Sequence, residues 1–324
     1  MNNTSVNEKT TSNNPVFRQI SFSETGNYSP WSARLAEIEK WEKTERNIEE
    51  VLKEYNEGWY ASLLKLWQDF SASAQSSSST AVIQRFFYQV SKHIAEEVER
   101  NKQVYRSSKE NYLFSSGDEF FIGDLMLGQL THQNVIIDYV DKQISKYNLR
   151  TIVETGCGTG VNLFYLYLYL NVERIRGGEI CSNAVELANQ ISKQCGVPGE
   201  FSQFDYREKT DLQNLTKELD EYLLITCHSI EQIQVRDNRF IENILSLPNP
   251  PKLVIHFEPI VWDDDSMMSR LCRRYAEKNK YNLDLLETIY GCRDDGRLEI
   301  LDVQKRCFGL SAYNPTSIIC WRAK

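Results

Sequence analysis

An acidic residue followed by three alternate glycines is the stretch of this sequence best suited to chemistry. It reads E-T-G-C-G-T-G and runs from Glu154 to Gly160. Residues 151–153 before it are β-branched and suit a strand buried in a parallel sheet. Glycine accepts positive φ angles and has no Cβ, so the turn can bring the backbone close to a ligand. Residues 161–170 alternate like a strand, but their position after a glycine turn favours a helix.

The spacing of the glycines separates two classes of cofactor. The dinucleotide fingerprint is G-x-G-x-x-G, whereas this sequence has G-x-G-x-G with Val161 at the last glycine position, which argues against NAD or FAD. The string E-x-G-x-G-x-G resembles the first motif of class I S-adenosylmethionine-dependent methyltransferases. In that family the turn passes beneath the methionine part of the cofactor, and the acid helps to hold its amino group. The resemblance implies S-adenosyl-L-methionine as cofactor, held here by Glu154, Gly156, Cys157, Gly158 and Gly160. A glycine-rich turn without a ligand is the alternative.

Two further strand ends extend the predicted cofactor site. Residues 174–180 are expected to form a second strand, and a carboxylate such as Glu179 at its end can accept hydrogen bonds from ribose hydroxyls. The resemblance implies the same role. A third strand at 200–204 leads into Asp205, where the family often has an acid that accepts from the adenine amino group, with Tyr206 lining the ring. The alternatives without a ligand are that Glu179 is a solvated residue at a strand end and that Asp205 is a turn residue. Ile180 and Cys227, which also lie at predicted strand ends, complete the predicted cofactor-binding residues.

The end of the predicted fourth strand, 222–227, carries H-S-I-E-Q-I. Ligands of open α/β sheets bind outside the carboxyl ends of the strands, so the methyl acceptor is expected here. His228 is the candidate general base, because its unperturbed pKa lies near neutrality. Glu231 is expected to orient that imidazole or to bind the acceptor. The alternative is that His228 caps the sheet and Glu231 begins a solvated helix.

The predicted fifth strand, 252–258, contributes a second group of chemically useful side chains. Alternation places His256 and Glu258 on one face, and Trp262 follows shortly after. His256 is added to the catalytic candidates, and Glu258 and Trp262 to the substrate-binding ones. Imidazole and carboxylate from the two strand ends suit a divalent metal, but no local ligand spacing supports one, so no metal is predicted.

Composition limits the class of protein. The chain has 324 residues, 41% of them hydrophobic, which is enough for one large domain or two smaller ones. A formal charge of −8 disfavours a general nucleic-acid binder. Eight cysteines without paired spacing suit reduced thiols. Neither a secretory signal nor a membrane-spanning stretch is recognisable, so we expect a cytoplasmic protein that does not act at a membrane. Composition leaves open whether it is a monomer or a homodimer.

The residues before the glycine turn divide into a tail and a helical region. Residues 1–30 are polar, and we expect them to be flexible or to lie over another surface. Residues 31–129 are expected to form a helical cap over the substrate. Within it an apolar stripe with helical spacing indicates core contacts, and 71–80 is a low-complexity loop; the stripe consists of Leu35, Ile38, Trp41, Ile48, Val51, Leu52 and Tyr55. Residues 105–130 suit a loop packed over a cleft, with Tyr112, Phe120 and Phe121 as pocket or core residues.

These patterns together predict an α/β protein with a Rossmann-like, seven-stranded, mostly parallel sheet and helices on both faces. The cofactor-binding domain is expected to span 130–324, after a helix at 131–147. Residues 267–287 should be helical with a break near Asn282, and 297–303 and 316–322 should form an antiparallel pair, as in the family. The predicted reaction is methyl transfer to a hydroxyl or amine of a small molecule. A protein side chain as acceptor, or a non-catalytic cofactor-binding protein, are the alternatives.

Overall fold

The computed structural model describes residues 17–36, 49, 52–73, 78–233 and 239–324. Its centre is a seven-stranded sheet in the order β6-β5-β4-β7-β8-β10-β9. The five strands from β6 to β8 are parallel, whereas β10 is antiparallel to both β8 and β9. The bounds of the seven strands are β4 Thr151–Thr155, β5 Arg174–Glu179, β6 Gly199–Gln203, β7 Leu223–Cys227, β8 Leu253–Glu258, β9 Leu298–Phe308 and β10 Thr316–Ala323. This order confirms the predicted Rossmann-like fold.

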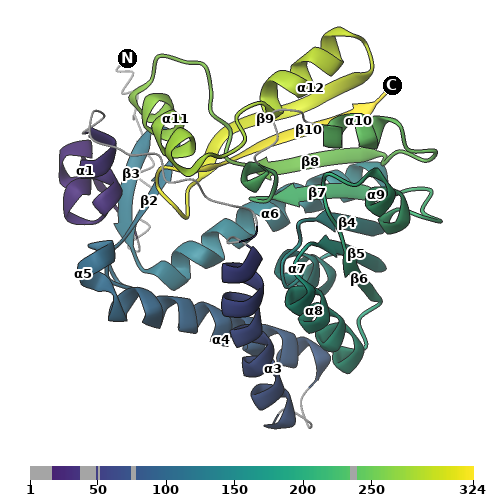
Figure 1. Ribbon diagram of the computed structural model, residues 1–324, viewed down its shortest axis with the longest axis horizontal. Helices are drawn as coiled ribbons and strands as arrows, with labels where there is room; N and C mark the ends of the chain where they lie inside the picture. Colours follow the sequence, from purple (N-terminus) through teal and green to yellow (C-terminus); the bar gives the residue numbers. More distant parts are fainter. Residues whose placement is uncertain (1–16, 37–48, 50–51, 74–77, 234–238) are drawn as a thin grey trace, which may run out of the picture.

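Helices cover both faces of this sheet (Figure 1). One face carries α6 Leu125–Tyr147, α7 Val161–Tyr169 and α8 Ser182–Cys195, most of whose buried apolar residues belong to one cluster. The other carries α9 Lys209–Leu215, α10 Arg239–Leu245 and α12 Leu285–Asp294, which belong to a second cluster. Strand alternation decides the face, since Ile152 faces the first cluster and Val153 the second. The helix predicted after the glycine turn is α7, and the predicted break near Asn282 separates α12 from α11 Met267–Asn279.

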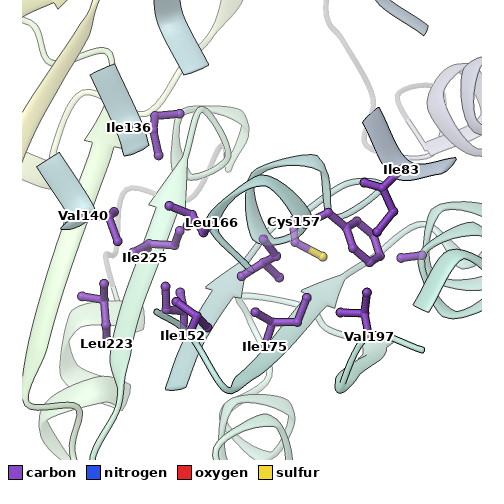
Figure 2. Packing of buried hydrophobic residues seen from close by; sticks show 14 of the residues in the cluster. Ile83, Ile136, Val140, Ile152, Cys157, Leu166, Ile175, Val197, Leu223 and Ile225 are labelled. Atoms are coloured by element: carbon purple, nitrogen blue, oxygen red, sulfur yellow. The ribbon is translucent and has the colours of Figure 1, made fainter. Parts of the chain in front are cut away.

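The helices before the sheet extend the first core cluster. They are η3 Lys53–Tyr60, a π-helix, then α3 Ala61–Ser73 and α4 Ser79–Arg100; the short α5 Lys102–Tyr105 follows them and buries no residue. Trp67 and Phe86 are at most 1% exposed and pack edge to face, 5.0 Å apart. Figure 2 shows Ile83 of α4 in the same cluster as Ile175 of the sheet. Of the predicted apolar stripe, Ile38, Trp41, Ile48 and Val51 lie outside the described residues.

The segment expected to be a loop over a cleft is a β-hairpin. Strands β2 Tyr112–Ser116 and β3 Glu119–Gly123 are joined by two residues, and Gly117 has a φ of 58°. A Gly-Asp pair between aromatic runs is a hairpin signal, which the sequence analysis missed. Helix α6 begins at Leu125 rather than Thr131, because Asp124 caps it by accepting from the Leu127 amide at 3.1 Å.

The tail predicted as residues 1–30 is in part regular structure. Strand β1 Phe17–Ile20 pairs with β3, and η1 Phe22–Asn27 and α1 Pro30–Ala36 follow it. Ile20 is 6% exposed and packs in a cluster with Phe120 and Tyr313. Apolar burial against a hairpin distant in sequence holds these residues, which local composition does not reveal. Within the described residues, no helix is both long and apolar enough to cross a membrane.

The glycines of β5 leave room for aromatic side chains of the neighbouring strand. A Cβ on Gly177 would lie 2.4 Å from Cδ1 of Phe201 and 2.6 Å from Sγ of Cys157. We predict that Gly177→Ala lowers the free energy of unfolding by about 1–3 kcal/mol, because the packed core must shift. In the control Gly291→Ala nothing lies within 4 Å of the new Cβ, so stability should stay within about 1 kcal/mol of wild type. Urea unfolding of both variants checks this, and equal stabilities would contradict it.

Candidate active site

The glycine turn closes the carboxyl end of β4 with three left-handed residues. Gly156, Gly158 and Gly160 have φ angles of 67°, 53° and 76°. The amides of Gly156 and Cys157 donate to the carbonyl of Gly178, at 2.7 and 3.0 Å, and so tie the turn to β5. Cys157 is 4% exposed, and its side chain lies in the core cluster (Figure 2). Only its backbone is therefore available to a cofactor.

Glu154 is a buried carboxylate at the base of this turn. Its side chain is held by Asn162, whose Nδ2 donates to Oε1 at 2.7 Å, and the residue is 1% exposed. Among the described residues Oε2 has no hydrogen-bond partner. Burial raises the pKa of Glu154 to about 8. A buried acceptor without a donor is costly, so the turn suits a ligand that brings a cation or donor to this atom.

Glu179 ends β5 and faces the same turn. Its Oε2 accepts from the amide of Gly158 at 2.9 Å, and its Oε1 accepts from the amide of Cys181 at 3.0 Å. The residue is 7% exposed. Each carboxylate oxygen has a second lone pair, so the group can hold the backbone and still accept from a hydroxyl. The half-buried Ile180 lies beside it in the chain.

Asp205 and Tyr206 follow β6 and are already bonded to other residues. Asp205 accepts from Arg207 through Nε at 2.9 Å and Nη2 at 2.5 Å, and this ion pair lowers the pKa of Asp205. The Tyr206 hydroxyl donates to the carbonyl of Thr155 at 2.7 Å and lies 2.7 Å from Oγ of Ser229. Its phenol therefore spans the ends of β4 and β7, where the half-exposed Cys227 also lies.

His228 lies directly after β7 in a left-handed conformation, with a φ of 47°. Its Nε2 lies 2.6 Å from Oγ1 of Thr316, and its Nδ1 lies 3.7 Å from Oε1 of Glu231. Burial acts to lower the pKa of His228, but Glu231 and Glu258 outweigh it, so the pKa is raised. The structure thus brings His228 and Glu231 together, as the sequence predicted.

Two carboxylates hold the loop that carries His228. Glu231 is 6% exposed and accepts from Nδ2 of Asn314 at 2.7 Å and from Nε2 of Gln232 at 3.0 Å. Glu258 accepts from the amide of Ser229 at 3.1 Å and of Ile230 at 3.2 Å. Burial raises the pKa of Glu258 to about 7. Its contacts are with this loop, so Glu258 acts as an anchor rather than as the predicted substrate ligand.

His256 and Trp262 are structural. His256 is fully buried; its Nε2 accepts from Nε1 of Trp321 at 2.9 Å, and its Nδ1 lies 3.0 Å from Oγ1 of Thr226. Burial lowers its pKa to about 3, so it has neither a free nitrogen nor the basicity of a catalytic base. Trp262 is 4% exposed and donates to Ser317 at 3.0 Å. Both predictions are corrected.

The three aromatic residues proposed to line a pocket belong to the small sheet of β1, β2 and β3. Phe120 is 2% exposed and packs 5.7 Å from the ring of Tyr313. Tyr112 packs 5.3 Å from the ring of Phe114, and Phe121 lies in the same cluster. The sequence left open whether these three residues line a pocket or pack in the core, and their contacts are those of core residues.

Several side chains at the site come from distant parts of the chain, and the sequence analysis missed them. Tyr60 of η3 covers the glycine turn, since its hydroxyl would lie 3.1 Å from a Cβ on Gly158. Asn56 fixes this segment on α8, because its Oδ1 accepts from the amide of Asn183 at 2.9 Å. Thr316 and Asn314 follow the β9–β10 turn, and His132 comes from α6. No local sequence motif identifies these residues. The aromatic residues in 53–60 were the one signal in the sequence that this segment packs against another part of the chain.

A small cavity lies between the end of β8 and residues 282–286, next to the loop that carries His228. It is lined by Glu231 and Glu258 among others, and its volume of about 10 Å³ is close to the minimum for one water molecule. Within the described residues, no group of three or more His, Cys, Asp or Glu side chains is placed to hold a metal ion.

Known proteins show only distant likeness to this chain. No protein-family model and no curated protein matches the chain. The chain is similar to solved structures that include an O-methyltransferase from Bacillus cereus in complex with SAH, with 14% identity over 60% of this chain and 81% of that one, at a TM-score of 0.41. Another is magnesium protoporphyrin IX methyltransferase from Synechocystis PCC 6803 with bound SAH, with 13% identity over 62% and 85%, at 0.44. A third is an S-adenosylmethionine-dependent methyltransferase from Clostridium acetobutylicum, with 13% identity over 57% and 89%, at 0.39. All three TM-scores are below 0.5, so the assignment of the fold rests on the strand order described above.

The raised pKa of Glu154 makes stability depend on pH. The native carboxyl titrates near 8 and the unfolded one near 4.5, so the native state holds an extra proton between these values. This contribution to stability is present below about pH 4.5 and is lost as the pH rises through 8. We predict that Glu154→Gln becomes more stable relative to wild type by about 1–3 kcal/mol between pH 6 and pH 8.5. Denaturant unfolding at both values measures it, with the exposed Glu173→Gln as control; a pH-independent difference would contradict it.

Proposed function

We propose that this protein is an S-adenosylmethionine-dependent methyltransferase that acts on a hydroxyl or amine of a small molecule. The observation that carries the proposal is the buried Oε2 of Glu154, which has no partner among the described residues and lies under three left-handed glycines. A carboxylate in this position suits the ammonium group of an amino-acid cofactor. A pyrophosphate brings no cation to this group, and its negative charges would oppose ionisation of the carboxyl.

The residues around the turn fit the rest of the same cofactor. Glu154 and Asn162 are suited to its amino-acid end, and the glycines leave space for the backbone to approach it. Glu179 is suited to ribose hydroxyls, since both of its oxygens keep a free lone pair. Tyr60 covers Gly158 and is suited to contact the bound molecule from above. When bound, S-adenosylmethionine supplies a sulfonium methyl group that a nucleophile can displace.

The chain itself provides the base and the environment for that displacement. His228 is placed after β7, at the carboxyl end of the sheet, and its pKa is raised. It takes the proton that the acceptor loses as the new bond to the methyl carbon forms. Glu231 stabilises the resulting imidazolium, because its nearest oxygen lies 3.7 Å from Nδ1. Much of the rate would come from holding the acceptor in line with the methyl group.

The nature of the acceptor is inferred from the surroundings of the site. The helical region η3 to α4 packs against α8 and the main core, so it covers the cofactor side of the sheet. Such a cover favours a compact acceptor. The negative net charge of −8 does not favour nucleic acid. A peptide side chain as acceptor would need a wider opening.

The test of this proposal separates cofactor binding from catalysis. Glu154→Gln should weaken binding of S-adenosylmethionine about 10- to 100-fold, because a charge-assisted contact is lost. His228→Ala should keep this affinity but lower kcat about 10²- to 10⁴-fold. Binding is measured by equilibrium dialysis, and turnover with methyl-labelled cofactor against pools of small hydroxyl and amine compounds. Glu173→Gln, an exposed partner of Arg150, is the control.

Three results would count against parts of the account. If His228→Ala and Glu231→Ala both leave methyl transfer unchanged, the catalytic assignment is wrong. If Glu154→Gln and Glu179→Ala leave cofactor affinity unchanged, the proposed cofactor site is wrong. If the wild-type protein binds cofactor but transfers no methyl group to any pool, the non-catalytic alternative is favoured.

A further inference from the structure

Two histidine side chains from distant elements share one hydroxyl group. Oγ1 of Thr316, at the start of β10, lies 2.6 Å from Nε2 of His228 and 2.9 Å from Nε2 of His132. His132 belongs to α6, and its ring meets that of His228 edge to face, 5.5 Å between centroids. The contacts join residues 88 and 184 positions apart, so the fold alone brings them together.

The single proton of the hydroxyl allows two arrangements of this group. A threonine hydroxyl donates one hydrogen bond and accepts others. If it donates to His132, then His228 must carry its proton on Nε2 and donate to Thr316. If it donates to His228, the proton of a neutral His228 is on Nδ1 and His132 is the donor. The hydroxyl therefore couples the tautomers of the two rings.

The surroundings favour the arrangement with the proton of His228 on Nε2. The distance from Nδ1 of His228 to Glu231 is 3.7 Å, which is longer than a hydrogen bond, whereas the contact with Thr316 is short. Glu231 is already held by Asn314 and Gln232, so it does not need the proton on Nδ1. Burial lowers the pKa of His132 to about 3, so this ring stays neutral and can accept from Thr316.

The titratable groups around His228 come from three elements. Glu231 belongs to η4 Ile230–Gln232, Glu258 ends β8, and the neutral His132 lies on α6. Both carboxylates act on His228 in the same direction and favour its protonated form. Nδ1 is the ring nitrogen next to Glu231, so a proton accepted there lies 3.7 Å from a carboxylate oxygen that stabilises the imidazolium.

We propose that Thr316 and His132 are positioning residues that keep a proton on Nε2 of His228 and so leave Nδ1 as the atom that accepts the proton of the methyl acceptor. This rests on the proposed function. As the oxygen or nitrogen of the acceptor bonds to the methyl carbon, the carbon–sulfur bond breaks and its electron pair stays on sulfur. The proton of the acceptor moves to Nδ1, and the imidazolium formed is stabilised by Glu231.

The test reads the tautomers directly, without a ligand. The chain has four histidines, so single substitutions suffice to assign the ring nitrogens of ¹⁵N-histidine-labelled full-length protein by NMR. His256 is an internal reference, because its Nε2 accepts from Trp321 and its proton must be on Nδ1. Neutral His228 should carry its proton on Nε2, opposite to His256, both in wild type and in Thr316→Ser, which keeps the hydroxyl. Thr316→Val should lose this preference.

A matched control uses the other hydroxyl–imidazole pair. Thr226→Val removes the hydroxyl that lies 3.0 Å from Nδ1 of His256 and should leave the His228 signals unchanged. In turnover assays Thr316→Val should lower kcat about tenfold or more, with the KM for S-adenosylmethionine unchanged and activity restored in Thr316→Ser. A wild-type His228 with its proton on Nδ1, or a Thr316→Val protein with wild-type tautomer and kcat, would overturn the proposal. Protein with the expected tautomers that fails to bind the cofactor would instead overturn the proposed function alone.

Discussion

A buried acidic side chain without a cationic partner, at the point where the central strand of the sheet turns, is the constraint on which the site depends. Glu154 is 1% exposed and has one oxygen without a partner among the described residues. The fold maintains it there because the strand is fixed on both sides by β5 and β7 and the turn is tied to Gly178. A buried group of this kind reduces the stability of the free protein, and a cationic ligand relieves it.

The part of the site around His228 is also held by a buried acidic side chain, because a carboxylate at the end of one strand binds the loop that follows the neighbouring strand. Glu258 at the end of β8 accepts the amides of Ser229 and Ile230, and so fixes the loop in which His228 lies. The short hydroxyl contact from β10 then fixes the ring itself. Because β10 lies antiparallel beside β8, its first residue reaches the carboxyl ends of the parallel strands. The antiparallel strand is therefore also what brings Thr316 to His228.

The sequence predicted the parts of the fold that local patterns determine. The β-branched run, the glycine turn and the acidic strand ends, with the family resemblance, predicted a mostly parallel seven-stranded sheet and placed Glu154, Glu179, His228 and Glu231 at its strand ends. Two kinds of feature were missed. The hairpin at 112–123 carried a turn signal that was overlooked, and the strand at 17–20 depends on pairing with it. The partners of the site, such as Tyr60 and Thr316, are positioned by tertiary packing. His256 was misjudged for the same reason: alternation placed it on a face but did not reveal Trp321 across the strand pair.

Calorimetric titration with S-adenosylmethionine at pH 7, in two buffers of different ionisation heat, is the most direct test of the central claim. Free Glu154 is largely protonated at this pH, since its pKa is about 8. If an ammonium group binds against it, the carboxyl ionises, and we predict the release of about one proton per cofactor bound, which disappears above pH 9. Binding without proton release, or no heat with this cofactor alongside tight uptake of a dinucleotide, would contradict the account.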